Sequence, residues 1–473
     1  MKINNQGNWE NVTNRVIIVS EGMNTSMFSE NEKVLISRFE KQEKDVVSIN
    51  DLDSNLILVK SNESSEKMRM HGASVRSSVN NDIETIAIAG SSEESFYLSE
   101  GLLLANYQFL KYFKEETQEK KTNQLNTLEL SAEVSNDACN ELLHTYQAVN
   151  WARTMVNEPV SYLNAEQFAE EMKELAKSAP LEVSVLEKTQ LESLKMGGIL
   201  AVNQGSIDPP TFTILEHKPE NPQNEKPIVL VGKGVVYDTG GLSLKPTPNS
   251  MDLMKIDMGG AACVAGAIYL AALQNLPLHI ICLVPATDNR PGLNAYAPGD
   301  IVTMFDGTTV EVRNTDAEGR MLLADALAYS NKYDPELVID AATLTGAAVR
   351  ALGDFASCVM GNADDSYFAQ LETASVECHE RIARFPFWDD YLEEMKSPIA
   401  DLNNLGGSYA GMITAGKFLE HFVNAPFIHM DLGNPVYRTS ADGYRVKGGT
   451  GAGVRLLYHF LKNYKYWRNQ KIN

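Results

Sequence analysis

The alternation of helix-like and strand-like patterns after residue 163 constrains the fold most strongly. Short apolar runs of strand length recur between longer segments whose apolar residues are spaced as on one face of a helix. Strands are expected at residues 181–185, 227–231, 278–284 and 337–339, helices at 165–176, 258–274, 321–333 and 454–464, and a hairpin turn at Asp306-Gly307. This alternation predicts an α/β fold with a mostly parallel sheet covered by helices on both faces.

The first part of the chain differs in composition from the rest. Its first 115 residues are rich in Asn, Ser and Glu, with strand-like runs at 16–19, 56–59 and 85–89, a helix-like run at 98–113, and then a polar stretch at 114–126 that is expected to be an exposed loop. A helical pattern over 137–156 ends near Pro159, because proline restricts the residue before it. A chain of 473 residues is long enough for two or three domains. We therefore predict an N-terminal α/β domain (1–136), a linker helix (137–162) and a larger C-terminal domain (163–473).

Two carboxylates lie one residue apart in the segment 314–320, which reads Asn-Thr-Asp-Ala-Glu-Gly-Arg and directly precedes an apolar helical pattern. On an irregular segment leading into a helix, Asp316 and Glu318 can both turn toward one centre, and that centre would carry positive charge. A structural alternative is that Asn314 or Asp316 caps the helix and the acids stabilise its positive end.

Further charged residues follow the apolar run at 227–231. Lys233 and Asp238 fall at and just beyond its carboxyl end, where open α/β sheets bind ligands, and Lys245 and Asp257 come soon after. Several glycines between them allow tight turns and close backbone approach. The alternative for this stretch by itself is a glycine-rich loop with solvated charges.

Taken together, Asp238, Asp257, Asp316 and Glu318 border apolar strands and an Ala-rich helix, so they are poorly explained as a solvated surface. Converging carboxylates favour divalent cations, and a pair of ions about 3.5–4 Å apart can share them. A neutral Lys233 could complete one ion's shell, because burial beside a metal lowers the pKa of lysine. None of the eight histidines lies in these segments, which disfavours a His-rich zinc site or a Ser-His-Asp relay. A phosphate loop at 232–234 is disfavoured too, because the Gly-x4-Gly-Lys-Ser/Thr spacing is missing.

These segments resemble the leucyl (cytosol) aminopeptidases, a family of dinuclear metallo-exopeptidases whose signature is the segment at 314–320. The resemblance covers most of the C-terminal two-thirds of the chain and includes residues 294–302, 339–346, 401–407, 413–416 and 447–451. The loop at 246–251 has one extra residue, which changes the spacing to Asp257. The resemblance implies that residues 163–473 form a catalytic metallopeptidase domain.

The resemblance also implies two divalent metal ions per subunit, Zn²⁺ or Mn²⁺. Asp238, Asp316 and Glu318 would hold one ion. Lys233, Asp238, Asp257 and Glu318 would hold the second.

Catalytic and substrate-binding residues follow from the same resemblance. Lys245 and Arg320 become the catalytic side chains, with a bicarbonate ion at Arg320 because a guanidinium does not lose its proton. Met254, Thr343 and Gly346 line up with the substrate pocket, which suggests a leucine-like first residue. Peptides with a free N-terminus would be the substrates, and a homohexamer would be the assembly.

Charge and cysteine content bear on partners and location. The net charge of −21 disfavours nonspecific nucleic-acid binding, and with it the additional regulatory or DNA-binding role that some members of the family carry. Five scattered cysteines indicate reduced thiols. The first residues lack the apolar core of a signal peptide, and the longest apolar stretch, 261–273, is too short to span a bilayer. These observations predict a cytoplasmic protein without a membrane partner.

Overall fold

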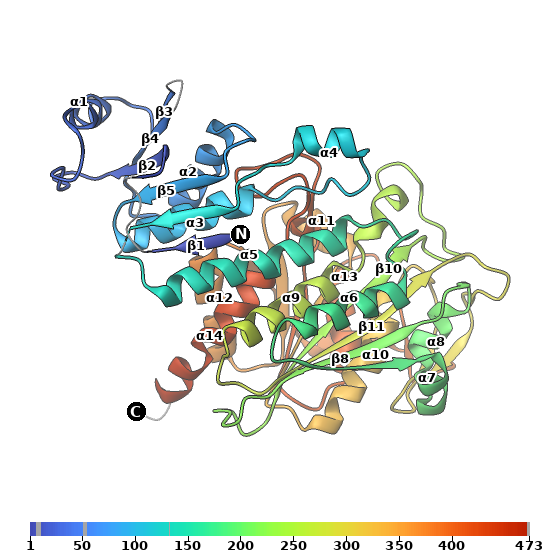
Figure 1. Ribbon diagram of the computed structural model, residues 1–473. Helices are drawn as coiled ribbons and strands as arrows, with labels where there is room; N and C mark the ends of the chain where they lie inside the picture. Colours follow the sequence, from blue (N-terminus) through green and yellow to red (C-terminus); the bar gives the residue numbers. More distant parts are fainter. Residues whose placement is uncertain (6–10, 51–53, 132, 471–473) are drawn as a thin grey trace. The chain divides into compact units, whose positions relative to one another are not determined.

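The chain was analysed as a computed structural model that describes residues 1–5, 11–50, 54–131 and 133–470, the last six by their backbone alone (Figure 1). It divides into two compact units. Unit 1 comprises Met1–Asn150 and Thr439–Lys447, and unit 2 comprises Trp151–Arg438 and Gly448–Asn473.

Unit 1 is built on a six-stranded sheet with the order β1-β6-β5-β2-β4-β3, in which only β3 is antiparallel to its neighbour among the described strands. Alternate residues of β2 point to opposite faces: Val16 and Ile18 pack in one apolar cluster, and Ile17 and Val19 in another. The elements are β1 (Lys2–Asn4), β2 (Asn14–Val19), α1 (Glu30–Phe39), β3 (Val46–Asn50), β4 (Asn55–Lys60), α2 (Ser65–Ser78), β5 (Thr85–Ala89), α3 (Ser92–Ala105), α4 (Glu115–Lys121), β6 (Thr127–Leu130) and the start of α5 (Asn136–Asn157).

Two expectations for unit 1 are wrong in detail. The helix expected at 98–113 is α3, which begins earlier because Ser91 caps it by accepting a hydrogen bond from the backbone N–H of Glu94. The polar stretch 114–126 is exposed as expected, but it contains α4. This short helix has glutamates in its first turn and lysines in its last, which complement the helix dipole.

The short segment Thr439–Lys447 belongs to unit 1 although both of its flanks belong to unit 2. The Tyr444 hydroxyl donates a hydrogen bond to Glu66 (2.8 Å), and Arg445 forms an ion pair with the same carboxylate (2.8 Å). The flanks of the segment meet in unit 2, where β19 (Tyr437–Arg438) pairs antiparallel with β20 (Gly448–Gly449).

Unit 2 contains a nine-stranded sheet with the order β16-β15-β18-β14-β9-β11-β8-β7, and β10 pairs with the end of β11. The strands at its centre are parallel. Toward the edges, β15 is antiparallel to β18, β8 is antiparallel to β11, and β7 is antiparallel to β8. The strands are β7 (Glu182–Glu187), β8 (Thr211–His217), β9 (Ile228–Gly232), β10 (Gly234–Asp238), β11 (Ile280–Asn289), β14 (Leu337–Ala342), β15 (Ser357–Gly361), β16 (Ile382–Arg384) and β18 (Phe427–Asp431). A smaller sheet joins β12 (Ile301–Thr303), β13 (Thr309–Glu311) and β17 (Leu402–Asn403), and β12 and β13 form the expected hairpin around Gly307.

Helices cover both faces of this sheet. Figure 1 shows α9 and α6 across one face, and α10 packs on β9 and β11 from the other. The helices are α6 (Ala165–Lys177), α7 (Lys188–Leu194), α8 (Gly197–Asn203), α9 (Gly259–Leu273), α10 (Gly319–Ser330), α11 (Gly346–Leu352), α12 (Asp365–Cys378), α13 (Gly411–Glu420) and α14 (Val454–Gln470), with 3₁₀ segments η2 (Met251–Ile256), η3 (Asn331–Tyr333), η4 (Asp389–Met395) and η5 (Asn434–Val436). The predicted α/β fold, with its mostly parallel sheet covered on both faces, is confirmed.

The helical stretch Met251–Leu273 comprises η2 and α9. It is long and apolar enough to cross a membrane, which the sequence reading did not expect, but 89% of its apolar window is buried inside the protein. Burial within unit 2 identifies it as a core helix.

Candidate functional site

The predicted site residues lie at the carboxyl ends of neighbouring parallel strands. Lys233 follows β9 directly, Asp238 ends β10, and Thr343 follows β14. Asp257 lies between η2 and α9. This edge of the sheet is where open α/β folds bind ligands, as the sequence predicts.

Asp316 and Glu318 lie on the turn that leads into α10. Glu318 immediately precedes the helix, and neither Asn314 nor Asp316 caps it: the side chain of Asn314 instead accepts a hydrogen bond from the backbone N–H of Asp316 (2.8 Å). Both carboxylates are therefore free to face the sheet edge. Gly319 follows because a Cβ at this position would overlap the side chain of Lys233.

The ammonium group of Lys233 lies among buried carboxylates. Its Nζ is 2.6 Å from Asp257 and 3.0 Å from Glu318, and it donates to the Thr343 carbonyl oxygen (3.0 Å). Burial lowers the pKa of this lysine, but the charges of Asp257, Glu318 and Asp238 outweigh burial and raise it. Lys233 thus supplies positive charge to this end of the site.

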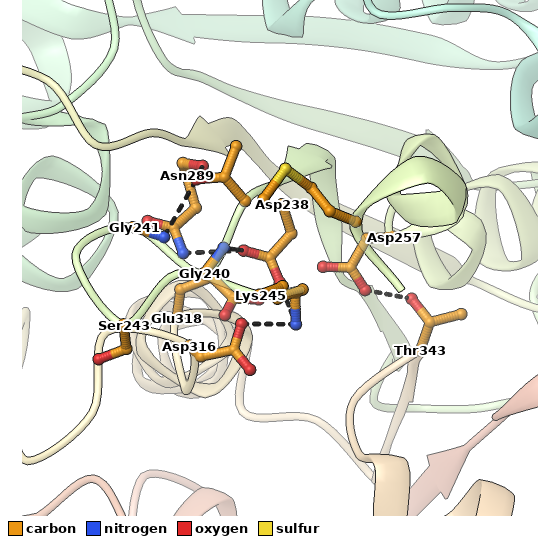
Figure 2. Close-up of polar contacts among 12 residues, drawn as sticks. Asp238, Gly240, Gly241, Ser243, Lys245, Asp257, Asn289, Asp316, Glu318 and Thr343 are labelled. Atoms are coloured by element: carbon orange, nitrogen blue, oxygen red, sulfur yellow. Dashed lines mark hydrogen bonds and ion pairs between the residues drawn. The ribbon is translucent and has the colours of Figure 1, made fainter. Parts of the chain in front are cut away.

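Lys245 forms ion pairs with the carboxylates of Asp238 and Asp316. Figure 2 shows its ammonium group between Asp238 and Asp316, at 2.9 and 2.5 Å. Burial and the charges of Glu318 and Asp238 raise the pKa of Asp316 to about 7, although Lys245 opposes this. Burial raises the pKa of Asp238 and Asp257 as well. The negative charge of the four carboxylates thus exceeds the positive charge of the two lysines.

The carboxylates fit a divalent cation. One oxygen from each of Asp238, Asp316 and Glu318 lies within 4.8 Å of the others. Glu318 Oε2 is buried and has no hydrogen-bond partner among the described residues. Leaving a buried carboxylate oxygen unpaired is costly, and a hard cation bound to oxygens would remove that cost.

Arg320 is the second residue of α10 and is buried. Its Nε and Nη1 have no hydrogen-bond partner within the described part of the chain. Burial lowers its pKa to about 10, against the charges of Glu318 and Asp431, so the guanidinium stays charged at neutral pH. Two unpaired N–H donors on a planar cation suit a small planar oxyanion.

A cavity of about 570 Å³ opens beside these groups. It is lined by all ten predicted site residues: Lys233, Asp238, Lys245, Met254, Asp257, Asp316, Glu318, Arg320, Thr343 and Gly346. The sequence reading missed other lining residues, among them Leu344, Arg350 and Leu405.

Asn289 was also missed, although it holds a key carboxylate in place. It ends β11, and its Nδ2 donates to Asp238 Oδ1 (2.8 Å) and to the Thr315 carbonyl oxygen (2.9 Å), so it joins the two predicted segments (Figure 2). The backbone N–H of Gly240 donates to the same oxygen of Asp238 (2.8 Å). The sequence feature that could have identified Asn289 is its position as a polar residue at the end of a long apolar strand.

Comparisons with known proteins agree with this geometry. A probable cytosol aminopeptidase of Chlorobium phaeobacteroides is 48% identical over 316 residues, which are 66% of this chain but only 62% of the relative, less than two thirds of its length. One of Chlorobaculum tepidum is 45% identical over 380 residues, 78% of this chain and 75% of the relative.

Solved structures are similar over nearly the whole chain. The bottromycin maturation enzyme BotP in complex with Mn has a TM-score of 0.84 and 30% identity, with 96% of this chain and 99% of that chain covered. A tomato leucine aminopeptidase variant has a TM-score of 0.84 and 28% identity, with 98% and 96% covered. The family profile described as "Cytosol aminopeptidase family, catalytic domain" matches residues 150–458. The chain therefore belongs to the cytosol aminopeptidase family, whose members are aminopeptidase hydrolases.

Proposed function

We propose that this enzyme is a metal-dependent aminopeptidase that releases N-terminal residues from peptides. The observation that carries the proposal is the group of carboxylate oxygens from Asp238, Asp316 and Glu318, which lie within 4.8 Å of one another at the wall of a peptide-sized cavity.

Two divalent ions, Zn²⁺ or Mn²⁺, would be held here. Asp238, Asp316 and Glu318 hold one, and Lys233, Asp238, Asp257 and Glu318 hold the other. When bound, the ions polarise the scissile carbonyl and lower the pKa of a water molecule that acts as the nucleophile. Lys233 would bind as the neutral amine, so metal binding releases its proton. The manganese complex of BotP, a similar structure, supports a site for such ions.

The chain's own catalytic groups are Lys245 and Arg320. The Lys245 side chain is 16% exposed at the cavity wall, and its ammonium group donates to the oxygen that becomes negative when the carbonyl is attacked. Arg320 would hold a bicarbonate ion through its unpaired Nε and Nη1, and that anion supplies the proton acceptor that a guanidinium cannot be.

Substrate selection follows from the remaining walls. Asp257 orients the free α-amine together with one ion, so an N-terminus is required. Thr343 donates a hydrogen bond to Asp257 (2.9 Å) and holds this carboxylate in place. Met254, Thr343 and Gly346 bound the space for the first side chain, which suits leucine-like residues.

We further propose a cytoplasmic homohexamer. The resemblance to the family carries this part, and light scattering at working concentration tests it: a monomer would contradict the assembly.

The central test is cleavage of leucyl p-nitroanilide and Leu-Gly by purified protein, first stripped of metal and then reloaded with Mn²⁺, Zn²⁺ or Co²⁺. Activity should return only with metal, and mass spectrometry should find single residues removed from the N-terminus. N-acetylated forms of both substrates should not be cleaved. Internal fragments, or cleavage of acetylated substrates at a comparable rate, would refute the exopeptidase proposal.

A further inference from the structure

We propose that Arg350 adapts this cavity to peptides whose first residue is acidic, glutamate above all. This inference rests on the proposed aminopeptidase function and names a second class of substrate for the same site. Arg350 lies on α11, is exposed, and lines the cavity beside Gly346 and Val349.

The position of the guanidinium follows from the helix. Arg350 is four residues after Gly346, so the two lie on the same face of α11, and long side chains on a helix point back toward its N-terminus. Arg350 Nη1 lies 3.2 Å from the place where a Cβ on residue 346 would be. Glycine thus leaves room for the guanidinium at the wall that bounds the space for the first side chain.

The other cationic side chains that line the cavity are already engaged. Lys233 and Lys245 are paired with carboxylates, and Arg320 is buried and is the residue proposed to hold bicarbonate. Within the described part of the chain, the guanidinium of Arg350 makes no hydrogen bond or ion pair. It is therefore a cavity cation available to a substrate.

An acidic side chain needs such a partner here, because its carboxylate loses part of its hydration on entering the cavity beside Met254, and the unpaired guanidinium can replace those hydrogen bonds. Glutamate is favoured over aspartate because its longer methylene chain can lie along Met254 while its carboxylate reaches the guanidinium. Arginine binds carboxylates in a planar two-pronged geometry that lysine cannot reproduce.

The experiment compares kcat/KM for glutamyl and glutaminyl 7-amido-4-methylcoumarin with the metal-loaded enzyme. The two substrates have nearly the same shape, so the Glu/Gln ratio reports charge alone, and neither has a C-terminal carboxylate. Arg350→Ala should lower the ratio by about two- to fivefold, the range for a partly exposed charge pair, and Arg350→Glu should lower it further. Arg350→Lys should retain an intermediate ratio.

Salt and a matched variant provide controls. Raising the ionic strength from about 0.1 M to about 1 M shortens the screening length from about 10 Å to about 3 Å, so the ratio should fall in the wild-type enzyme but not in Arg350→Ala. Arg38→Ala removes an exposed arginine of α1 in unit 1, and should leave the ratio unchanged.

The outcomes distinguish a failure of the role proposed for Arg350 from a failure of the proposed aminopeptidase function. If leucyl p-nitroanilide is cleaved but the Glu/Gln ratio is the same in wild type, Arg350→Ala and Arg350→Glu, the role of Arg350 is refuted and the aminopeptidase function stands. If Arg350→Ala instead weakens cleavage of Leu-Gly but not of Leu-Gly amide, with the ratio unchanged, the guanidinium binds a C-terminal carboxylate and the inference is also refuted. If no metal-loaded sample cleaves any of these substrates, both proposals fall.

Discussion

Removing the side chain of Asn289 should weaken metal binding without removing a metal ligand. In Asn289→Ala, Asp238 keeps both carboxylate oxygens, but Oδ1 loses one of its two hydrogen bonds, the one from Asn289 Nδ2 at 2.8 Å, and retains the one from Gly240. The link from β11 to the Thr315 carbonyl oxygen is lost as well. The carboxylate then becomes less well oriented for a cation.

The magnitude follows from these contacts. A hydrogen bond to a charged group contributes about 1.5–3 kcal/mol, and Asp238 is only 2% exposed, so water replaces the lost bond poorly. Each 1.4 kcal/mol corresponds to about a tenfold change in affinity. We expect the metal dissociation constant to rise by about 10- to 100-fold, in the range found when partners of metal-ligating groups are removed. The kcat at saturating metal should recover largely, because all ligands remain.

Isothermal titration of the stripped protein with Mn²⁺, together with the metal concentration that restores half of the activity, measures this change. Asn224→Ala is the matched control: Asn224 is also buried and also donates two hydrogen bonds, to the carbonyl oxygens of Lys226 and His279. Equal metal affinity in wild type and Asn289→Ala, or an equal loss in Asn224→Ala, would refute the reasoning.

Three further predictions concern the same site. Glu318→Ala should abolish activity and lower the metal content measured by mass spectrometry, because this carboxylate is proposed to bind both ions; normal turnover with full metal content would contradict the dinuclear proposal. Lys245→Ala should lower kcat by about 10²–10³ while metal content is unchanged, whereas loss of metal would make Lys245 a ligand. Activity should rise from pH 6 to mildly alkaline pH, because the substrate's α-amine, with an ordinary pKa of about 7.7–8.0, must lose its proton to bind; a flat profile in kcat/KM would argue against amine binding.

The residues proposed for the centre of the site could be picked out from the sequence because short segments next to strand ends carry them. The turn at 314–320 and the residues after β9 supply their own local geometry, and the apolar run before them marks the strand. Asn289 and Arg350 lie outside those segments. Their place at the site depends on the pairing of β10 with β11 and on the direction of α11, which apolar periodicity does not encode.

Strand ends were predicted less well, for a physical reason visible at Asp340. The expected strand 337–339 stops before this charged residue, yet β14 continues to Ala342. Asp340 pairs in register with His429 of β18, and their side chains lie 2.8 Å apart with both fully buried. In the sequence, each of these two residues interrupts an apolar pattern. In the structure, the ion pair across the two strands offsets the cost of burying them, and the sequence pattern does not show this pairing. The strand β18 was not predicted for the same reason, because His429 and Asp431 interrupt its apolar pattern.

The segment Thr439–Lys447 means that neither unit is one continuous stretch of chain. Removing residues 1–150 would leave Tyr444, now 1% exposed, without Glu66 and would expose its aromatic ring to solvent. The paired flanks offer a remedy, because Arg438 and Gly448 are already cross-strand neighbours in β19 and β20. A tight turn joining these two residues would excise the segment and leave unit 2 as an uninterrupted chain, so circular permutation and separate expression of the units become practical at this point.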